Sequence, residues 1–116
     1  MTQPILSLLV IRSADVGALI KFYELFGLSF KMEQHDNGPI HHSARLGDMV
    51  FEIYRSKEPD KITLGFAVDD LNSLIIKLRN TSVEIFSYAE SSPFGYRSIV
   101  RDPDSRMVFL YQREPV

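Results

Sequence analysis

The chain has 116 residues, 45% of them hydrophobic and 24% charged, and its formal net charge at pH 7 is −2. This composition is typical of one compact globular domain and argues against disorder. The absence of cysteine excludes disulfides, thiolate nucleophiles and cysteine-bound zinc or iron–sulfur centres. Because the sequence has neither an apolar run of about 20 residues nor a basic stripe, we expect a cytoplasmic protein that binds neither membranes nor nucleic acid.

The first half of the chain reads as a strand, a helix and three further strands. A nearly continuous apolar run over Ile5–Ile11 predicts a buried strand. Ser13 or Asp15 is the expected N-cap of the helix that follows, and Gly27 is its expected end. Three more strands are predicted over Leu28–Glu33, Ile40–Leu46 and Met49–Tyr54, with a loop over 35–39 and a two-residue turn at Gly47 and Asp48.

The same order of elements returns after a polar linker over Arg55–Lys61. A strand over Ile62–Val68 leads to a helix capped by Asp69 or Asp70. Strands follow over Val83–Phe86, Tyr96–Arg101 and Met107–Gln112, with a loop over 88–95 and a four-residue turn over 102–105. The repeat predicts an α+β fold of two tandem βαβββ modules, about 4–54 and 61–112, in one domain of residues 1–116. We expect the two curved sheets to enclose a cleft.

Several short motifs carry a resemblance that covers nearly the whole chain. They are Phe22-Tyr23, Phe51-Glu52-Ile53, Ser92-Pro93-Phe94-Gly95-Tyr96 and Arg101-Asp102-Pro103-Asp104-Ser105. In these the chain resembles the vicinal oxygen chelate superfamily, which includes glyoxalase I, bleomycin resistance proteins and extradiol dioxygenases. The resemblance implies paired modules in a half-open barrel, and a homodimer. Relatives usually have glycine where this chain has Ser105.

The resemblance also implies a divalent metal ion held by four side chains. By position, the four ligands correspond to Leu8, Glu52, Thr63 and Phe109. Leucine and phenylalanine cannot bind a metal ion, threonine is a poor neutral donor, and one carboxylate alone would bind the ion weakly. We therefore expect no metal at the usual site and no cofactor.

Strand alternation and turn geometry predict which side chains face the cleft. The turn at Gly47 and Asp48 places Ser43 beside Glu52 and His41 beside Tyr54, and the turn over 102–105 places Ser98 beside Phe109. The predicted ligand-binding residues are His41, Ser43, Arg45, Glu52, Tyr54, Tyr96, Ser98 and Phe109. One wall is polar and the other aromatic and apolar, which suits a small organic ligand with an anionic or hydrogen-bonding end. His42 is expected on the helix side and His35 in the loop, outside the site.

The sequence alone leaves three functions open. The first is a metal-free small-molecule-binding protein resembling the bleomycin resistance type. The second is a lyase or isomerase resembling glyoxalase I, with a metal held by Glu52 and unexpected partners such as His41. The third is a structural or regulatory module with a filled cavity. A structural ion pair between Glu52 and Arg45 competes with a binding role for either. No catalytic residue is assigned, and the resemblance would also allow a dioxygenase-like activity.

Overall fold

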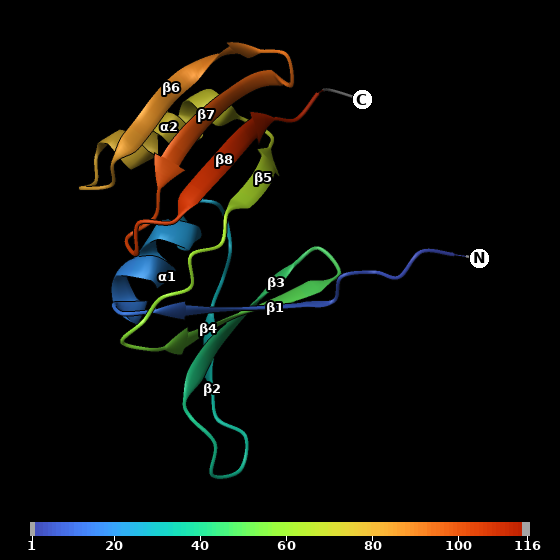
Figure 1. Ribbon diagram of the computed structural model, residues 1–116, viewed down its shortest axis with the longest axis vertical. Coiled ribbons are helices and arrows are strands. Elements are labelled where there is room, and N and C mark those ends of the chain that lie inside the picture. The colour runs from blue at the N-terminus through green and yellow to red at the C-terminus, as the bar shows by residue number, and fades with distance from the viewer. Residues whose placement is uncertain (1, 115–116) are drawn as a thin grey trace. The chain divides into compact units, whose positions relative to one another are not determined.

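The computed structural model of the chain describes residues 2–114 and divides into two compact units, with the boundary between Asp60 and Lys61. Each unit contains one helix and one four-stranded mixed sheet (Figure 1). The predicted α+β fold with two tandem βαβββ modules is therefore confirmed. None of the helices in the described residues combines the length and apolar character needed to cross a membrane.

In the first unit, a helix follows the first strand and three strands then complete the sheet. The elements are β1 (Leu8–Ser13), α1 (Val16–Glu24), β2 (Lys31–Glu33), β3 (His41–Leu46) and β4 (Met49–Arg55). The strand order is β1-β4-β3-β2, in which β1 is parallel to β4 and the other pairs are antiparallel. A parallel pair requires a long crossover connection, and the chain from α1 to β3 supplies it.

The second unit repeats this topology. Its elements are β5 (Leu64–Val68), α2 (Leu71–Arg79), β6 (Ile85–Ser92), β7 (Gly95–Arg101) and β8 (Met107–Gln112), in the order β5-β8-β7-β6. The loop predicted over 88–95 is wrong, because Ser92 pairs with Gly95 and leaves only a hairpin tip between them. The end of β6 contains alanine and glutamate, which have a low strand propensity. The end of β6 is therefore held in the sheet by its pairing with β7. This pairing contains two register shifts.

Side chains of aspartate cap both helices. Asp15 Oδ1 accepts a hydrogen bond from the backbone N–H of Ala18 at 3.1 Å, and Asp70 acts in the same way at the start of α2. The Ser13 hydroxyl instead accepts from the N–H of Asp15 at 3.1 Å. Of the alternatives that the sequence left open, Asp15 and Asp70 are thus the N-caps, and their side chains satisfy backbone donors that the first helical turn leaves free.

Asp70 makes the stability of the second unit dependent on pH. The N–H of Ser73 donates to Asp70 Oδ1 at 3.0 Å, and hydrogen bonds from Ser73 hold the pKa of Asp70 below its ordinary value. With a lowered folded-state pKa, the carboxylate stabilises the fold above its unfolded pKa, and this contribution is lost as the pH falls through the folded pKa. Asparagine caps a helix without titrating. We therefore expect the melting temperature, followed by circular dichroism, to fall more steeply below about pH 5 in the wild type than in Asp70→Asn. Parallel curves would contradict this.

Both sheets bury the face that their helix covers. In the first unit, Tyr23 of α1 lies against Phe51 of β4 with ring centroids 5.1 Å apart, and neither side chain is exposed. The other buried apolar residues of this core include Ile11, Leu19, Phe22 and Ile53. In the second unit, the buried set is Leu71, Leu74, Ile75, Leu78, Val100, Val108 and Leu110. The alternation of apolar residues thus correctly predicts the helix side of β4 and β8.

A five-residue loop that starts at Asp102 joins β7 to β8, where the sequence predicted a turn of four residues. Arg101 pairs with Met107 because Arg106 leaves the strand, and its Nε donates to Asp102 Oδ2 at 2.8 Å. The Asp102 carboxylate also accepts from two backbone N–H groups of the loop. Ser105 has a φ of 68°, which is the left-handed region that glycine adopts most readily.

The longer loop moves the pairing of β7 with β8 by one residue. Ser98 pairs with Leu110 and Ile99 pairs with Phe109. Since a shift of one residue turns every side chain to the other face of a strand, Ser98 and Tyr96 lie on the face covered by α2. The predicted grouping of these two residues with Phe109 is therefore wrong.

Candidate functional site

The face of the first sheet opposite α1 carries the polar residues that the sequence grouped together. The predicted register of the hairpin is confirmed, because Ser43 pairs with Glu52 and His41 pairs with Tyr54. Five predicted ligand-binding residues therefore share this face, namely His41, Ser43, Arg45, Glu52 and Tyr54. On β1, the residue paired with Glu52 is Val10, and Leu8 pairs with Val50.

A pocket of about 590 Å³ opens on this face between β2, β3 and β4. Its lining includes Phe30, Lys31, Ser43, Arg45 and Glu52. The pocket therefore combines an aromatic ring, a hydroxyl group and charges of both signs. Its volume lies within the range of about 300–1,000 Å³ that is usual for small-ligand sites.

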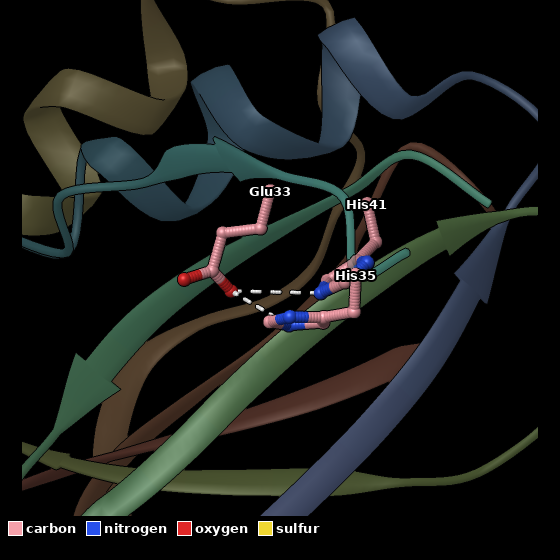
Figure 2. Close-up of side chains that lie close together, drawn as sticks. All are labelled: Glu33, His35 and His41. Carbon is pink, nitrogen blue, oxygen red and sulfur yellow. Dashed lines mark ion pairs between the residues drawn. The ribbon is translucent and has the colours of Figure 1, made fainter. Parts of the chain in front are cut away.

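Three side chains with nitrogen or oxygen donors gather beside this pocket (Figure 2). Glu33 at the end of β2 pairs with His41 at the start of β3, and the intervening loop contributes His35. The Oε1 atom of Glu33 lies 3.5 Å from His41 Nε2 and 4.0 Å from His35 Nε2. One donor atom from each of the three lies within 4.8 Å of the other two. From β4, Glu52 Oε2 approaches His41 Nε2 to 3.4 Å.

His41 occupies the centre of this cluster and is 2% exposed. Its Nδ1 lies 3.2 Å from the carbonyl oxygen of Pro39, and because a carbonyl oxygen only accepts, Nδ1 carries the hydrogen. Within residues 2–114, its Nε2 has no hydrogen-bond partner. Tyr54 stacks on the ring, with centroids 4.5 Å apart and planes 11° from parallel. The imidazole is thus fixed with its second nitrogen directed at the carboxylates.

Burial and nearby charges shift the pKa values of Tyr54 and Glu33. Burial raises the pKa of Tyr54, and the negative charges of Glu52 and Glu33 raise it further. Burial also favours a higher pKa for Glu33, but a hydrogen bond and the charge of Lys31, together with the two imidazoles, outweigh it and lower that pKa. Lys31 Nζ lies 3.3 Å from Glu33 Oε2, so the other carboxylate oxygen is the one that faces the imidazoles.

The ion pair between Arg45 and Glu52, which the sequence offered as a structural interpretation, is absent from the described residues. Glu52 approaches His41 instead, and Arg45 is exposed. The Arg45 guanidinium is therefore available at the rim of the pocket.

His35 lies in the predicted loop and does not line the pocket, but its ring approaches that of His41. The N–H of Gly38 donates to the His35 carbonyl oxygen at 2.9 Å, and a Cβ at Gly38 would lie 3.0 Å from that oxygen. This turn needs glycine, and it folds the loop back so that the rings of His35 and His41 are 5.1 Å apart. His42 pairs with Ile53 on the helix side, as predicted.

Glu33 and Lys31 were not among the predicted site residues. The signal that could have identified Glu33 is its position as the last strand residue before the loop, directly opposite His41. Residues that flank a closed hairpin loop pair with each other and share a face. The pairing was not predicted because the loop over 34–40 has seven residues, so its Asn37-Gly38 turn dipeptide does not by itself specify the register of the strands.

In the second unit, Phe109 and Thr63 line a hollow of about 300 Å³ together with Tyr111. The Arg97 guanidinium lies 5.6 Å from the centroid of the Phe109 ring, which is a cation–π distance. The sequence predicted an aromatic and apolar wall here. The error of one residue in the register of β7 accounts for the missed arginine.

Tyr96 and Ser98 make internal hydrogen bonds on the other face of β7. The Tyr96 hydroxyl donates to Asn72 Oδ1 of α2 at 3.1 Å. The Ser98 hydroxyl is buried and donates to the carbonyl oxygen of Ser87 at 2.6 Å. Both polar groups are thus satisfied within the second unit.

No family model matches the sequence, and no curated protein matches it. The fold does match solved structures. TnmS3, an antibiotic binding protein from Streptomyces sp. CB03234, aligns with a TM-score of 0.78 at 18% identity, covering 98% of this chain and 99% of that one. A glyoxalase/bleomycin resistance protein/dioxygenase family enzyme from Burkholderia phytofirmans PsJN aligns with a TM-score of 0.69 at 17% identity, covering 90% and 94%.

A glyoxalase I mutant from Zea mays aligns with a TM-score of 0.76 at 21% identity, covering 95% of this chain and 45% of that one. At such identities the likeness establishes the fold. The resemblance noted in the sequence is therefore confirmed at the level of the fold. This chain has the glyoxalase/bleomycin resistance fold.

Proposed function

We propose that the chain binds a small organic molecule with an anionic or hydrogen-bonding end, in the pocket of the first unit and without the metal site usual for the superfamily. The observation that carries this proposal is the lining of the pocket, where Arg45, Ser43 and Glu52 converge beside Phe30. A few convergent polar groups beside an apolar surface are typical of small-ligand sites. TnmS3, described as an antibiotic binding protein, has the same fold, which supports this class of function.

Arg45 is the residue that would hold the anionic end of the ligand. A guanidinium presents several N–H donors in a plane and binds a carboxylate through two parallel hydrogen bonds. Phe30 offers an aromatic surface within the same pocket, against which a ring of the ligand can pack. An aromatic carboxylate therefore matches the chemistry of the lining.

We expect Arg45→Glu to weaken binding of naphthoate by at least about tenfold, because a hydrogen bond to a charged group contributes roughly 1.5–3 kcal/mol. The measurement is an NMR titration of the full chain with naphthoate in the presence of EDTA, so that metal ions take no part. In the wild type, the shifted amide signals should come from the segments that line the pocket, around 29–33, 43–45 and 50–52.

Arg55→Glu is the matched control. Arg55 is exposed at the end of β4 and outside the lining of the pocket, and its replacement changes the net charge by the same amount. It should leave the affinity for naphthoate unchanged. Equal weakening in both variants, or shifts that are spread over the whole chain, would refute binding at this pocket.

The lyase or isomerase alternative receives no separate support, because the likeness to glyoxalase I at 21% identity is a likeness of fold. Loss of three of the four usual ligands, at Leu8, Thr63 and Phe109, favours a binding protein over Lewis-acid chemistry at that site. We retain the homodimer and the cytoplasmic location as predictions from the sequence.

A further inference from the structure

The nitrogen Nε2 of His41 is an unexplained polar atom in the first unit. It belongs to a side chain that is almost fully buried, and within the described residues it has no hydrogen-bond partner. Because Nδ1 carries the hydrogen that is donated to Pro39, Nε2 is the ring nitrogen that faces Glu33 and Glu52. When Nε2 carries no hydrogen, its lone pair faces two carboxylates, and a metal cation bound between them would replace the proton that otherwise stabilises this arrangement.

We propose that Glu33, His35 and His41 bind one divalent transition-metal ion, with Glu52 beside them as a fourth ligand. This site is distinct from the usual metal site of the superfamily, with which it shares only Glu52. Three of its members come from β2, from the following loop and from β3, all within the first unit (Figure 2). The inference does not depend on the proposed function.

The distances from His41 Nε2 to the two carboxylates suit ligands of one tetrahedral ion. Two ligands that bind one such ion at about 2.0–2.2 Å stand roughly 3.3–3.6 Å apart. The separations between His41 Nε2 and the two carboxylates are 3.4 and 3.5 Å. His35 is slightly farther, with its Nε2 at 4.0 Å from Glu33 Oε1, and its side chain is 72% exposed and so has room to rotate inward.

The surroundings of His41 are those of a metal ligand. A histidine that binds a metal usually donates its other ring N–H to a backbone carbonyl or a carboxylate, which fixes the tautomer and the ring orientation. In this site, the contact from Nδ1 to the Pro39 carbonyl oxygen fixes the tautomer of His41. The stacked ring of Tyr54 helps to fix the orientation of the imidazole. Lys31 pairs with Oε2 of Glu33, so that Oε1 of the same carboxylate faces His41.

The composition of the cluster indicates the class of ion. The two carboxylates supply negative charge, which attracts a divalent cation. Imidazole ligands favour zinc, copper, nickel or iron over magnesium and calcium, which prefer oxygen alone. Two histidines with one glutamate form a ligand set that is known for zinc. Zinc and cobalt are therefore the probes of choice.

The test is a metal titration of the full chain after treatment with EDTA and removal of the chelator. Co²⁺ binding is followed by its visible absorption, which is intense for tetrahedral sites, and Zn²⁺ binding by competition with a chromophoric chelator. We expect one equivalent per chain, and we expect His35→Ala to weaken binding by on the order of 100-fold. Because the His35 side chain is largely exposed, this variant should fold normally.

His42→Ala is the matched control, since His42 neighbours His41 but faces the helix side. It should bind the metal like the wild type, whereas Glu33→Gln should bind it weakly. Failure of the wild type to take up Co²⁺ or Zn²⁺ at millimolar concentration would overturn the proposal, and so would equal binding by His35→Ala. Because no organic ligand is present here and EDTA is present in the naphthoate titration, failure of one proposal leaves the other standing.

Discussion

Asp102→Ala should lower the free energy of unfolding by roughly 3 kcal/mol, because it removes a buried carboxylate that accepts several hydrogen bonds, although Arg106 keeps its ion pair with Asp104 at 3.0 Å. Asp102 is 4% exposed and its partner Arg106 is 2% exposed. Besides the 2.8 Å contact with Arg106 Nε, the carboxylate accepts from the backbone N–H groups of Asp104 and Arg106 at 2.9 and 3.0 Å. Alanine would remove the acceptor of these three hydrogen bonds, and the loss of each one destabilises the buried loop.

The measurement for Asp102→Ala is equilibrium unfolding in urea, compared with the wild type. Asp48→Ala is a control in another turn, because Asp48 is exposed between β3 and β4, and it should change the stability by less than about 0.5 kcal/mol. Asp102→Asn keeps an oxygen acceptor for the backbone but loses the charge. Its loss of stability should therefore lie between the losses in Asp102→Ala and Asp48→Ala. A loss below about 1 kcal/mol in Asp102→Ala would contradict the assigned role.

Phe51→Ala should cost about 3–5 kcal/mol through the lost transfer energy of the ring and the cavity that remains. Phe51 is fully buried at the centre of the first core. Its ring centroid lies 5.1 Å from that of Tyr23 and 6.1 Å from that of Phe30. The ring therefore links α1 to the sheet and to the segment before β2.

The unfolding of Phe51→Ala is compared with that of Phe94→Ala. Phe94 is 74% exposed at the tip of the β6–β7 hairpin, so its removal should cost less than about 1 kcal/mol. Similar losses in the two variants would contradict the assignment of the first core. Phe51→Leu should recover much of the stability, since it retains apolar volume.

The fold was largely predictable because the sequence patterns that specify its elements are local and because the same order of elements occurs in both units. Apolar alternation predicted the buried faces of β4 and β8, and the glycine-first turn predicted the register of the β3–β4 hairpin, which the structure confirms. Where no strong local signal exists, the prediction failed. The end of β6 is a strand only because β7 pairs with it.

The candidate site was predictable only in part. His41, Ser43 and Glu52 were grouped correctly because one short turn specifies their register. Glu33 and His35 were missed, since their approach to His41 depends on how the longer loop over 34–40 closes. In the second unit, the buried ion pair of Asp102 and Arg106 lengthens the loop by one residue. That single residue is enough to exchange the two faces of β7.

By itself, the sequence determined the types of element, their repeated order and the apolar side of the helix-covered strands, because propensity and periodicity act between near neighbours in the chain. The tertiary structure alone decided that two histidines and a glutamate converge beside Glu52, and that Arg97 rather than Ser98 accompanies Phe109. These outcomes depend on the closing of loops and on a buried charge pair. Such contacts join residues whose pairing no local pattern specifies.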